Sequence, residues 1–438
     1  MNLSRMRNDS AARGKRQSLL AAMGQFLIAP LFSNLSLRSD VRWDPQRLCY
    51  QAILMAFDSG RCLRDRFANV RQRMGWLFPK TRRVGKTYQG FVEALRRHSG
   101  VLLERLTAHL PSQVQAMAGR HWRVEGFCVF AVDGSQIDCP RTQANLEGLG
   151  RRGKDPLRPS LWLTMLWHVG TGLPWAWRID KATASEHTHL RQMLRLLPPQ
   201  ALLLMDAGFV SYELLREILG AGHSFLVRVG SNRQLLRGLG CAVRETATTV
   251  HLWPRDHRDG PPLELRLICR GSGEGKVFLL TNLPKEQLSK EQAGRLYRAR
   301  WGIEVYYRTL KQTLERRKML SGSPDLAQLE LAWTLVGLWV LGLLGVDALV
   351  QDGQSPGRLS AATALRILRE ALDGQLRQRL DRALAEAIKD LYARHGPKAS
   401  RNWADKKHDS PPKAPKMRNA TPAERRRAQW VSARMAAG

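Results

Sequence analysis

Residues 297–311 read YRARWGIEVYYRTLK and contain the pattern Tyr297, Arg300, Glu304 and Lys311. On a continuous α-helix, at roughly 100° per residue, these four side chains fall within an arc of about 60°. A surface helix normally carries apolar residues on the face that it buries, whereas this face carries an acid, two cations and a phenol. The pattern predicts a carboxylate that binds metal beside cations that bind phosphate groups.

Two further acids stand directly after predicted strands upstream of this segment. Asp133 follows the apolar run FCVFAV, and Asp206 follows the apolar run ALLLM. Short apolar runs that end in a glycine-containing turn predict buried strands, and sites in α/β sheets form at the carboxyl ends of strands. Each acid alone would be better explained as a helix cap or as a member of an ion pair. Together, Asp133, Asp206 and Glu304 predict a site for a pair of Mg²⁺ ions, which prefer oxygen ligands.

With these three blocks the chain resembles the IS4-type transposases, which are DDE recombinases with a ribonuclease-H-like catalytic core. The resemblance rests on VDGS at Asp133, on DAGF at Asp206 and on the Tyr-Arg-Glu-Lys pattern that ends at Lys311. The spacings also fit the family's layout, with 73 residues from Asp133 to Asp206 and 98 from Asp206 to Glu304. The resemblance covers residues 125–350, is faint before them and is absent from the C-terminal tail.

The resemblance implies a DNA transposase of an insertion sequence, which cuts at terminal inverted repeats and joins the freed 3′-OH ends to target DNA. It implies that Asp133, Asp206 and Glu304 are the catalytic, metal-binding residues, with two Mg²⁺ ions or Mn²⁺ as a substitute. Two such ions would activate the attacking oxygen and stabilise the leaving oxygen. It also implies a homodimer on double-stranded DNA. Two alternatives stay open: a DDE nuclease that no longer transposes, and a catalytically silent DNA-binding regulator.

Four side chains near the predicted acids are candidates for contact with DNA. Arg300 and Lys311 are predicted to bind phosphate, since a guanidinium binds two oxygens at once, and Tyr297 either donates to the same phosphate or packs. Trp301 is a candidate for stacking on an unpaired base. Trp253 is a weaker candidate for the same role, and packing in the core explains either tryptophan at least as well.

The composition favours a nucleic-acid partner. The chain has 438 residues, a formal net charge of +32 and 43% hydrophobic residues, enough for a sizeable core. Because the basic residues are spread along the whole chain, nucleic acid is a better match than a membrane surface or an acidic protein. The six cysteines form no C-x-x-C pair, which argues against structural zinc and disulfides and suits a reducing cytoplasm. The resemblance implies a bacterial cytoplasm, with the protein associated with the nucleoid.

The expected fold class is α/β: a ribonuclease-H-like core with an inserted β subdomain, a helical N-terminal region and a disordered basic C-terminal tail. The apolar run Leu331–Val346 falls short of the ~20 residues that a membrane span needs, so we expect a buried core helix and no membrane. Alternating short runs between residues 231 and 283 predict hairpins, which form the inserted subdomain. The expected boundaries are 1–120 for the helical DNA-binding region, 121–350 for the core, 351–395 for a C-terminal helical region and 396–438 for the tail.

The expected core contains strands and helices in the ribonuclease-H-like order, three strands followed by alternation. In the N-terminal region, the apolar spacing predicts helices over Asp44–Phe57 and Gln89–Leu110. The basic segment Arg61–Lys86 between them suits contacts to the DNA backbone or a solvated surface equally well, and no helix-turn-helix can be assigned from its sequence. The predicted core strands are Phe127–Val132, Leu161–Val169, Pro174–Ile179, Ala201–Met205 and Phe225–Val229, with helices over Ser185–Leu197 and Ser211–Ala221.

Overall fold

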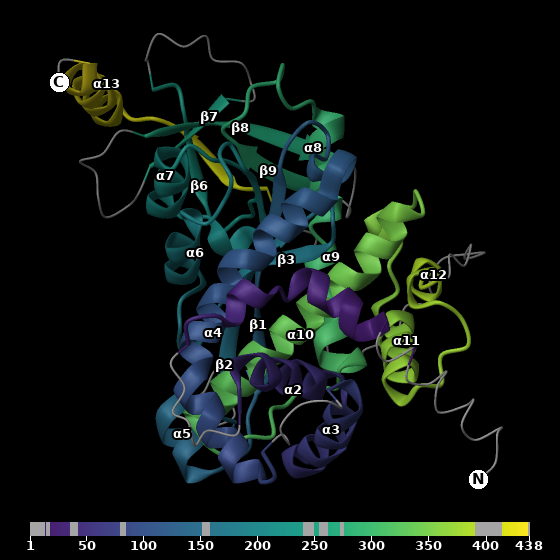
Figure 1. Cartoon of the computed structure of the whole chain (residues 1–438). Coiled ribbons are helices and arrows are strands. Elements are labelled where there is room, and N and C mark those ends of the chain that lie inside the picture. Colours follow the sequence, from purple (N-terminus) through teal and green to yellow (C-terminus); the bar gives the residue numbers. More distant parts are fainter. Residues whose placement is uncertain are drawn as a thin grey trace, which may run out of the picture. The chain divides into compact units, whose positions relative to one another are not determined.

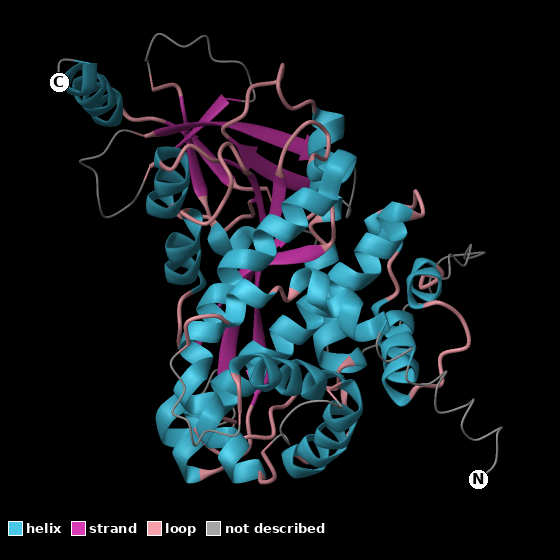
Figure 2. Cartoon of the chain, in the orientation of Figure 1, coloured by secondary structure: helices cyan, strands magenta, loops and turns pink. Residues whose placement is uncertain are grey.

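A computed structural model describes most of the chain as two compact units, drawn in Figure 1 and coloured by secondary structure in Figure 2. Unit 1 comprises Met1–Trp122, Gly134–Ala184 and Glu304–Asp390; unit 2 comprises Arg123–Asp133, Ser185–Ile303 and Leu391–Gly438. The residues that the structure describes are 14, 18–35, 43–78, 85–150, 158–239, 249–253, 262–271, 276–389 and 414–436.

The strands of unit 2 follow the order β10-β6-β7-β8-β9-β5-β4-β1. The parallel pairs β1 with β4 and β4 with β5 are built from apolar residues that are buried on both faces, as expected for parallel strands. The bounds are β1 Val129–Asp138, β4 Leu202–Met205, β5 Ser224–Arg228, β6 Gln234–Arg237, β7 Thr249–Leu252, β8 Leu263–Arg270, β9 Val277–Thr281 and β10 Lys416–Asn419. The helices of this unit are α6 Glu186–Leu194, α7 Tyr212–Gly220, α8 Lys290–Ala299 and α13 Pro422–Ala436.

Unit 1 contains the second half of β1, the antiparallel hairpin β2–β3 and a set of helices. Local caps fix where its helices begin: Asp44 accepts the N–H of Arg47 at the start of α2, and Thr87 accepts that of Gly90 at the start of α4. The bounds are β2 Ser160–His168, β3 Leu173–Lys181, α2 Pro45–Phe57, α3 Leu63–Leu77, α4 Tyr88–Ala118, α5 Gln143–Leu149, α10 Pro324–Gln351, α11 Ala361–Asp373 and α12 Leu380–Ala385. Helix α9, Gly302–Arg308, begins at the end of unit 2 and continues into unit 1.

Strand β1 is common to both units, and through it the core strands follow the order β3-β2-β1-β4-β5. This order confirms the predicted ribonuclease-H-like fold class. All five predicted core strands and both predicted core helices are present, with ends that differ by a few residues. The predicted N-terminal helices are present as α2 and α4, although α4 extends eight residues beyond the predicted end at Leu110, to Ala118.

The predicted insertion is built from β6, β7, β8 and β9, and these strands continue the core sheet. Strand β9 pairs with β5 in an antiparallel register, for example Val227 with Leu280, and β8 pairs with β9. The insertion therefore extends the sheet of unit 2 by hydrogen bonding. Residues 240–248, 254–261 and 272–275 of the predicted insertion lie outside the described residues.

Helix α10 has the length and apolarity of a membrane span, with 89% of its most apolar window buried inside the protein. It packs against α2 and α4 (Figure 1). Trp333 of α10 donates from Nε1 to the Oγ of the buried Ser99 of α4 at 2.8 Å. These contacts match the expectation of a core helix over Leu331–Val346.

The prediction of a disordered tail is wrong for residues 414–436, which form β10 and α13. Strand β10 adds to the edge of β6 in a parallel register, and Leu236, Leu239, Ala420 and Ala428 form a small core beneath the pair. Low apolar content suggested disorder, but an existing sheet edge supplies hydrogen bonds that a short polar strand lacks on its own. Residues 390–413 of the region lie outside the described part of the chain.

A charged pair holds the turn between β10 and α13, and its loss should loosen this segment. Glu424 accepts hydrogen bonds from the guanidinium of Arg418 at 2.7 Å and from the N–H of Thr421 at 2.7 Å. The bonds from Arg418 lower the pKa of the Glu424 carboxyl from 4.5 to about 2. A lowered pKa stabilises the folded segment above pH ~4.5, and this stabilisation is lost as the pH falls toward about 2.

We expect Glu424→Gln to reproduce this loss at neutral pH. Hydrogen–deuterium exchange of the amides of residues 416–420 should be faster in Glu424→Gln than in wild type, because their pairing with β6 opens more often. Glu217→Gln, which removes an exposed ion pair with Arg191 elsewhere in unit 2, is the control and should leave these amides unchanged. Equal exchange in Glu424→Gln and wild type would show that the pair does not stabilise the segment.

Candidate active site

The two predicted catalytic aspartates lie side by side in unit 2. Strands β1 and β4 pair in parallel, with Phe130 opposite Leu203 and Ala131 opposite Leu204. Two residues further along each strand, the same register places Asp133 beside Asp206, on strands that are about 4.8 Å apart. Strand β4 ends at Met205, so the two acids lie where the pairing of β1 with β4 stops.

The prediction that Asp133 ends its strand is wrong, because β1 continues to Asp138. The second half of β1 belongs to unit 1, where it lies next to β2 and Gln136 donates to the Oγ of Ser160 at 3.1 Å. The chain therefore has no turn at Gly134. Asp133 is placed at the edge of the β1–β4 pairing by the early end of β4, and its side chain is half-buried.

The DAGF block fixes the orientation of the Asp206 carboxylate. Its Oδ1 accepts the N–H of Gly208 at 2.8 Å and caps the short 3₁₀ turn Ala207–Phe209. A Cβ atom at Gly208 would lie 3.0 Å from that same Oδ1, so a larger residue would displace the carboxylate. The glycine of the motif is thus explained by close approach to the acid.

Sequence reasoning missed two residues beside Asp206. The Nε2 of His187 lies 2.9 Å from the carbonyl oxygen of Gly208, and its ring packs on Phe209 at a centroid distance of 5.8 Å. Arg228 ends β5, and because Met205 pairs with Val227, the register places Arg228 beside Asp206. The signal in the sequence was a cation at the end of the apolar run SFLV, whereas its alignment with the acids follows only from the register.

Tyr297 and Arg300 contact each other, and Tyr297 interacts electrostatically with Asp206. The guanidinium of Arg300 lies 5.6 Å from the centre of the Tyr297 ring, and the Arg300 residue is only 9% exposed. Burial raises the pKa of the Tyr297 phenol, and the Asp206 carboxylate adds to this, whereas Arg300 and Arg228 oppose it. Tyr297 of the predicted phosphate-binding pair is therefore close enough to Asp206 for the two groups to interact electrostatically.

The four residues of the Tyr-Arg-Glu-Lys pattern do not share one continuous helix, so the predicted single face is wrong. Helix α8 ends at Ala299 and α9 begins at Gly302, with a turn at Arg300 and Trp301 between them. A glycine at this junction lowers the helix propensity where the break occurs. The pattern is therefore spread over α8, the turn, α9 and a following π-helical turn.

Glu304 and Lys311 belong to unit 1. Glu304 lies in the first turn of α9, where the helix dipole stabilises a carboxylate, and Lys311 lies in the π-helical turn Thr309–Thr313. Within the part of the chain that the structure describes, no three His, Cys, Asp or Glu side chains are grouped closely enough to hold a metal ion. Within unit 2 the structure brings together Asp133 with Asp206 and Tyr297 with Arg300, whereas Glu304 and Lys311 lie in unit 1.

The two candidate tryptophans differ in their surroundings. Trp301, in the turn between α8 and α9, is 55% exposed, which suits a side chain that stacks on a partner molecule. Trp253 packs against the small core formed by Leu236, Leu239, Ala420 and Ala428. Its indole thus contributes to the attachment of β10 and α13.

A mixed sheet in this order, with Asp133 and Asp206 where the pairing of its central parallel strands stops, defines a class of protein: a ribonuclease-H-like domain. Residues 124–340 match the family described as "Transposase DDE domain". The matched segment contains every predicted catalytic and phosphate-binding residue.

Individual relatives agree with the family. The chain is 27% identical over 225 residues to the transposase InsG of insertion sequence element IS4 from Escherichia coli K12, covering 48% of this chain and 50% of that protein. It is 36% identical over 77 residues to the transposase of insertion sequence element IS421 from Escherichia coli, covering 18% of this chain and 19% of that protein. The similarity thus spans half the length of the first relative and about a fifth of the second. Among solved structures, the chain matches a piggyBac transposase in a synaptic complex with hairpin DNA, with a TM-score of 0.42, 12% identity and 88% coverage of both chains.

Proposed function

We propose that this protein is a DNA transposase of an insertion sequence, which cuts DNA at terminal inverted repeats and joins the 3′-OH ends to target DNA. The observation that carries the proposal is the register of three adjacent parallel strands, which aligns Asp133 in β1, Asp206 directly after β4 and Arg228 at the end of β5. Acids paired at the ends of strands supply the ligands for a cation, and a neighbouring guanidinium supplies a phosphate contact.

DDE transposase domains use divalent metal ions, and the donor set of this chain suits them. Asp133 and Asp206 supply carboxylate oxygens, which hard cations such as Mg²⁺ prefer to nitrogen or sulfur. We infer that Glu304 is the third carboxylate and that two Mg²⁺ ions bind, with Mn²⁺ as a substitute. When bound, such ions supply a stronger nucleophile and charge neutralisation during phosphodiester hydrolysis.

The remaining residues of the pattern are proposed to contact the DNA. The register of β4 with β5 places Arg228 beside Asp206, and Arg300 lies beside Tyr297, so a phosphate next to the acids would find cations in unit 2. Tyr297 would donate its phenolic hydrogen to a phosphate oxygen, and burial favours the protonated donor by raising its pKa. Lys311 would hold a further phosphate, and the exposed Trp301 would stack on an unpaired base.

The proposed partners are double-stranded DNA, as inverted repeat and as target, and a second copy of the chain that forms a homodimer on that DNA. The proposed location is the bacterial cytoplasm, in association with the nucleoid. A nuclease that has lost transposition is the second candidate, because the acids that cut a strand would be the same. A catalytically silent regulator is the third candidate.

An excision assay tests the proposal. A marker gene flanked by the DNA that borders this gene should be excised by the wild-type protein in a host that lacks other transposases. Excised junctions are counted by sequencing. Nicking of the bordering DNA without excision would favour the nuclease, and binding without any cleavage would favour the regulator.

A further inference from the structure

Helices α2 and α3 of unit 1 form a helix–turn–helix. Between the C-cap of α2 at Asp58 and the N-cap of α3 at Cys62 lie only Ser59, Gly60 and Arg61. A Cβ atom at Gly60 would lie 2.9 Å from Oδ1 of Asp58 and 3.0 Å from the backbone of Arg66, so the turn requires glycine. Two helices joined by such a short turn with a central glycine are the arrangement with which many proteins enter the major groove of DNA.

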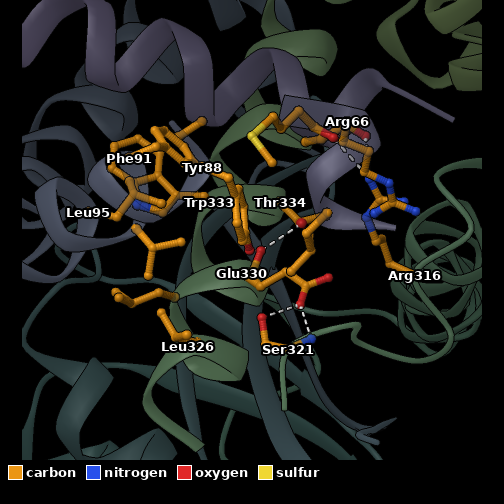
Figure 3. A pocket seen from close by; sticks show the side chains of 16 residues that line it. Arg66, Tyr88, Phe91, Leu95, Arg316, Ser321, Leu326, Glu330, Trp333 and Thr334 are labelled. Carbon is orange, nitrogen blue, oxygen red and sulfur yellow. Dashed lines mark hydrogen bonds between the residues drawn. The ribbon is translucent and has the colours of Figure 1, made fainter. Parts of the chain in front are cut away.

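Hydrogen bonds hold the inner side of α3 against the rest of unit 1. The buried Asp58 accepts hydrogen bonds from Asn69 at 3.2 Å and from Arg73 at 2.7 Å, and Arg73 also binds Asp373 of α11 at 2.8 Å. Arg66 points inward as well and donates to the carbonyl oxygen of Gly60 at 2.7 Å. Beneath Arg66 lies a small cavity of about 60 Å³ (Figure 3). Its lining includes Tyr88, Phe91, Glu330 and Trp333.

The outer side of α3 carries two exposed cations. Arg66 and Arg73 face inward, seven residues apart, whereas Arg64 and Arg71 are exposed, also seven residues apart. In the described part of the chain, neither Arg64 nor Arg71 has an acidic side chain within ion-pair distance. Gln72 is exposed beside them. On an α-helix, Arg64, Arg71 and Gln72 fall within an arc of about 100°.

Small residues separate these polar side chains. Ala68 and Gly75 fall within the same arc of α3. A Cβ atom at Gly75 would meet no other atom of the protein within 4 Å. Internal packing therefore does not require glycine here, and the missing side chain lets an external surface approach the helix backbone closely.

We propose that the outer face of α3 lies in the major groove of duplex DNA and reads its sequence. The groove, about 12 Å wide, admits a helix, and a side chain such as Gln72 pairs with the edge of adenine. Arg64 and Arg71 contact guanine edges or flanking phosphates, and Ala68 and Gly75 let the helix backbone approach the base pairs. DNA as partner rests on the proposed function, whereas the reading face rests on α3 itself.

Two glycine variants test the close approach. Gly75→Ala should keep or raise the melting temperature, because alanine favours a helix, yet weaken DNA binding at least about tenfold, the size of one good base-edge contact. Gly100→Ala is the matched control. Gly100 is also exposed within a helix, α4, and a Cβ atom there would also meet nothing within 4 Å. It should keep the melting temperature and bind DNA like wild type.

Binding is measured with the full chain in EDTA, so that no cleavage is needed, on duplexes selected from a random 20-base-pair library. Gln72→Ala should select a different consensus from wild type. Wild-type affinity in Gly75→Ala together with an unchanged consensus in Gln72→Ala would overturn the proposal, as would equal competition by single-stranded RNA. A protein that binds through α3 in EDTA but cuts nothing with Mg²⁺ would contradict only the proposed transposase function.

Discussion

Asp206→Asn is expected to abolish strand cleavage, with a loss of at least about 10²–10³-fold, the cost of removing one preorganised group that stabilises charge. Asparagine keeps the Oδ1 that accepts the N–H of Gly208, so the 3₁₀ turn and the strand register should be preserved. The negative charge that would hold a divalent cation is lost. The measurement is nicking of a labelled duplex from the bordering DNA in the presence of Mg²⁺.

The matched control is Asp138, which lies on β1, the strand that also contains Asp133. Asp138 is also an acid of β1, but its carboxylate pairs with Arg158 at 2.6 Å, so Asp138→Asn should leave cleavage within about twofold of wild type. Glu304→Gln should lose cleavage as Asp206→Asn does, because we propose Glu304 as the third carboxylate. If Asp206→Asn cut DNA at the wild-type rate, the row of acids would not be the catalytic site. If Glu304→Gln cut DNA at the wild-type rate while Asp206→Asn did not, the third carboxylate would be a residue other than Glu304.

The core strands could be predicted because their sequences are locally unambiguous. Phe127–Val132 and Ala201–Met205 are apolar runs ended by an acid and a glycine, and both lie in strands that are buried on both faces. The rule that functional residues lie at the carboxyl ends of strands predicted that Asp133 and Asp206 belong to one site. That rule does not give the order of the strands, so the position of Arg228 beside Asp206 required the register of β4 with β5.

Other features depend on contacts that are distant in sequence. The helical period of residues 297–311 is regular, yet the chain turns at Arg300 and Trp301, so a periodic pattern did not guarantee one helix. Residues 416–419 have no strand signal of their own and become a strand because β6 offers an open edge. The turn of α2 into α3 was hidden because its glycine is required by Asp58 and Arg66, which only the fold brings close.

The C-terminal end of α2 depends on one buried cation from a distant segment. Arg316 is 1% exposed and donates to the carbonyl oxygens of Met55 at 3.1 Å and Ala56 at 3.2 Å. It also donates to its own segment, at the carbonyl oxygen of Leu314. The last carbonyl groups of a helix have no partner within the helix, and a cation there also interacts favourably with the helix dipole. Burial lowers the pKa of the Arg316 guanidinium to about 10, so it is still charged at neutral pH.

Arg316→Met is therefore expected to destabilise unit 1 by about 3–5 kcal/mol, because it leaves buried carbonyl groups without donors while keeping most of the side-chain volume. The adjacent Arg317 is the control: it is exposed, and the carbonyl oxygen of its backbone accepts the N–H of Asp138, a bond that Arg317→Met retains. Differential scanning calorimetry should show a large drop in melting temperature for Arg316→Met and little change for Arg317→Met. Because the same helix end leads into the turn before α3, Arg316→Met should also weaken DNA binding in EDTA. Equal melting temperatures for the two variants would show that the carbonyl groups find other donors, such as Arg369, which already binds Phe57 at 2.7 Å.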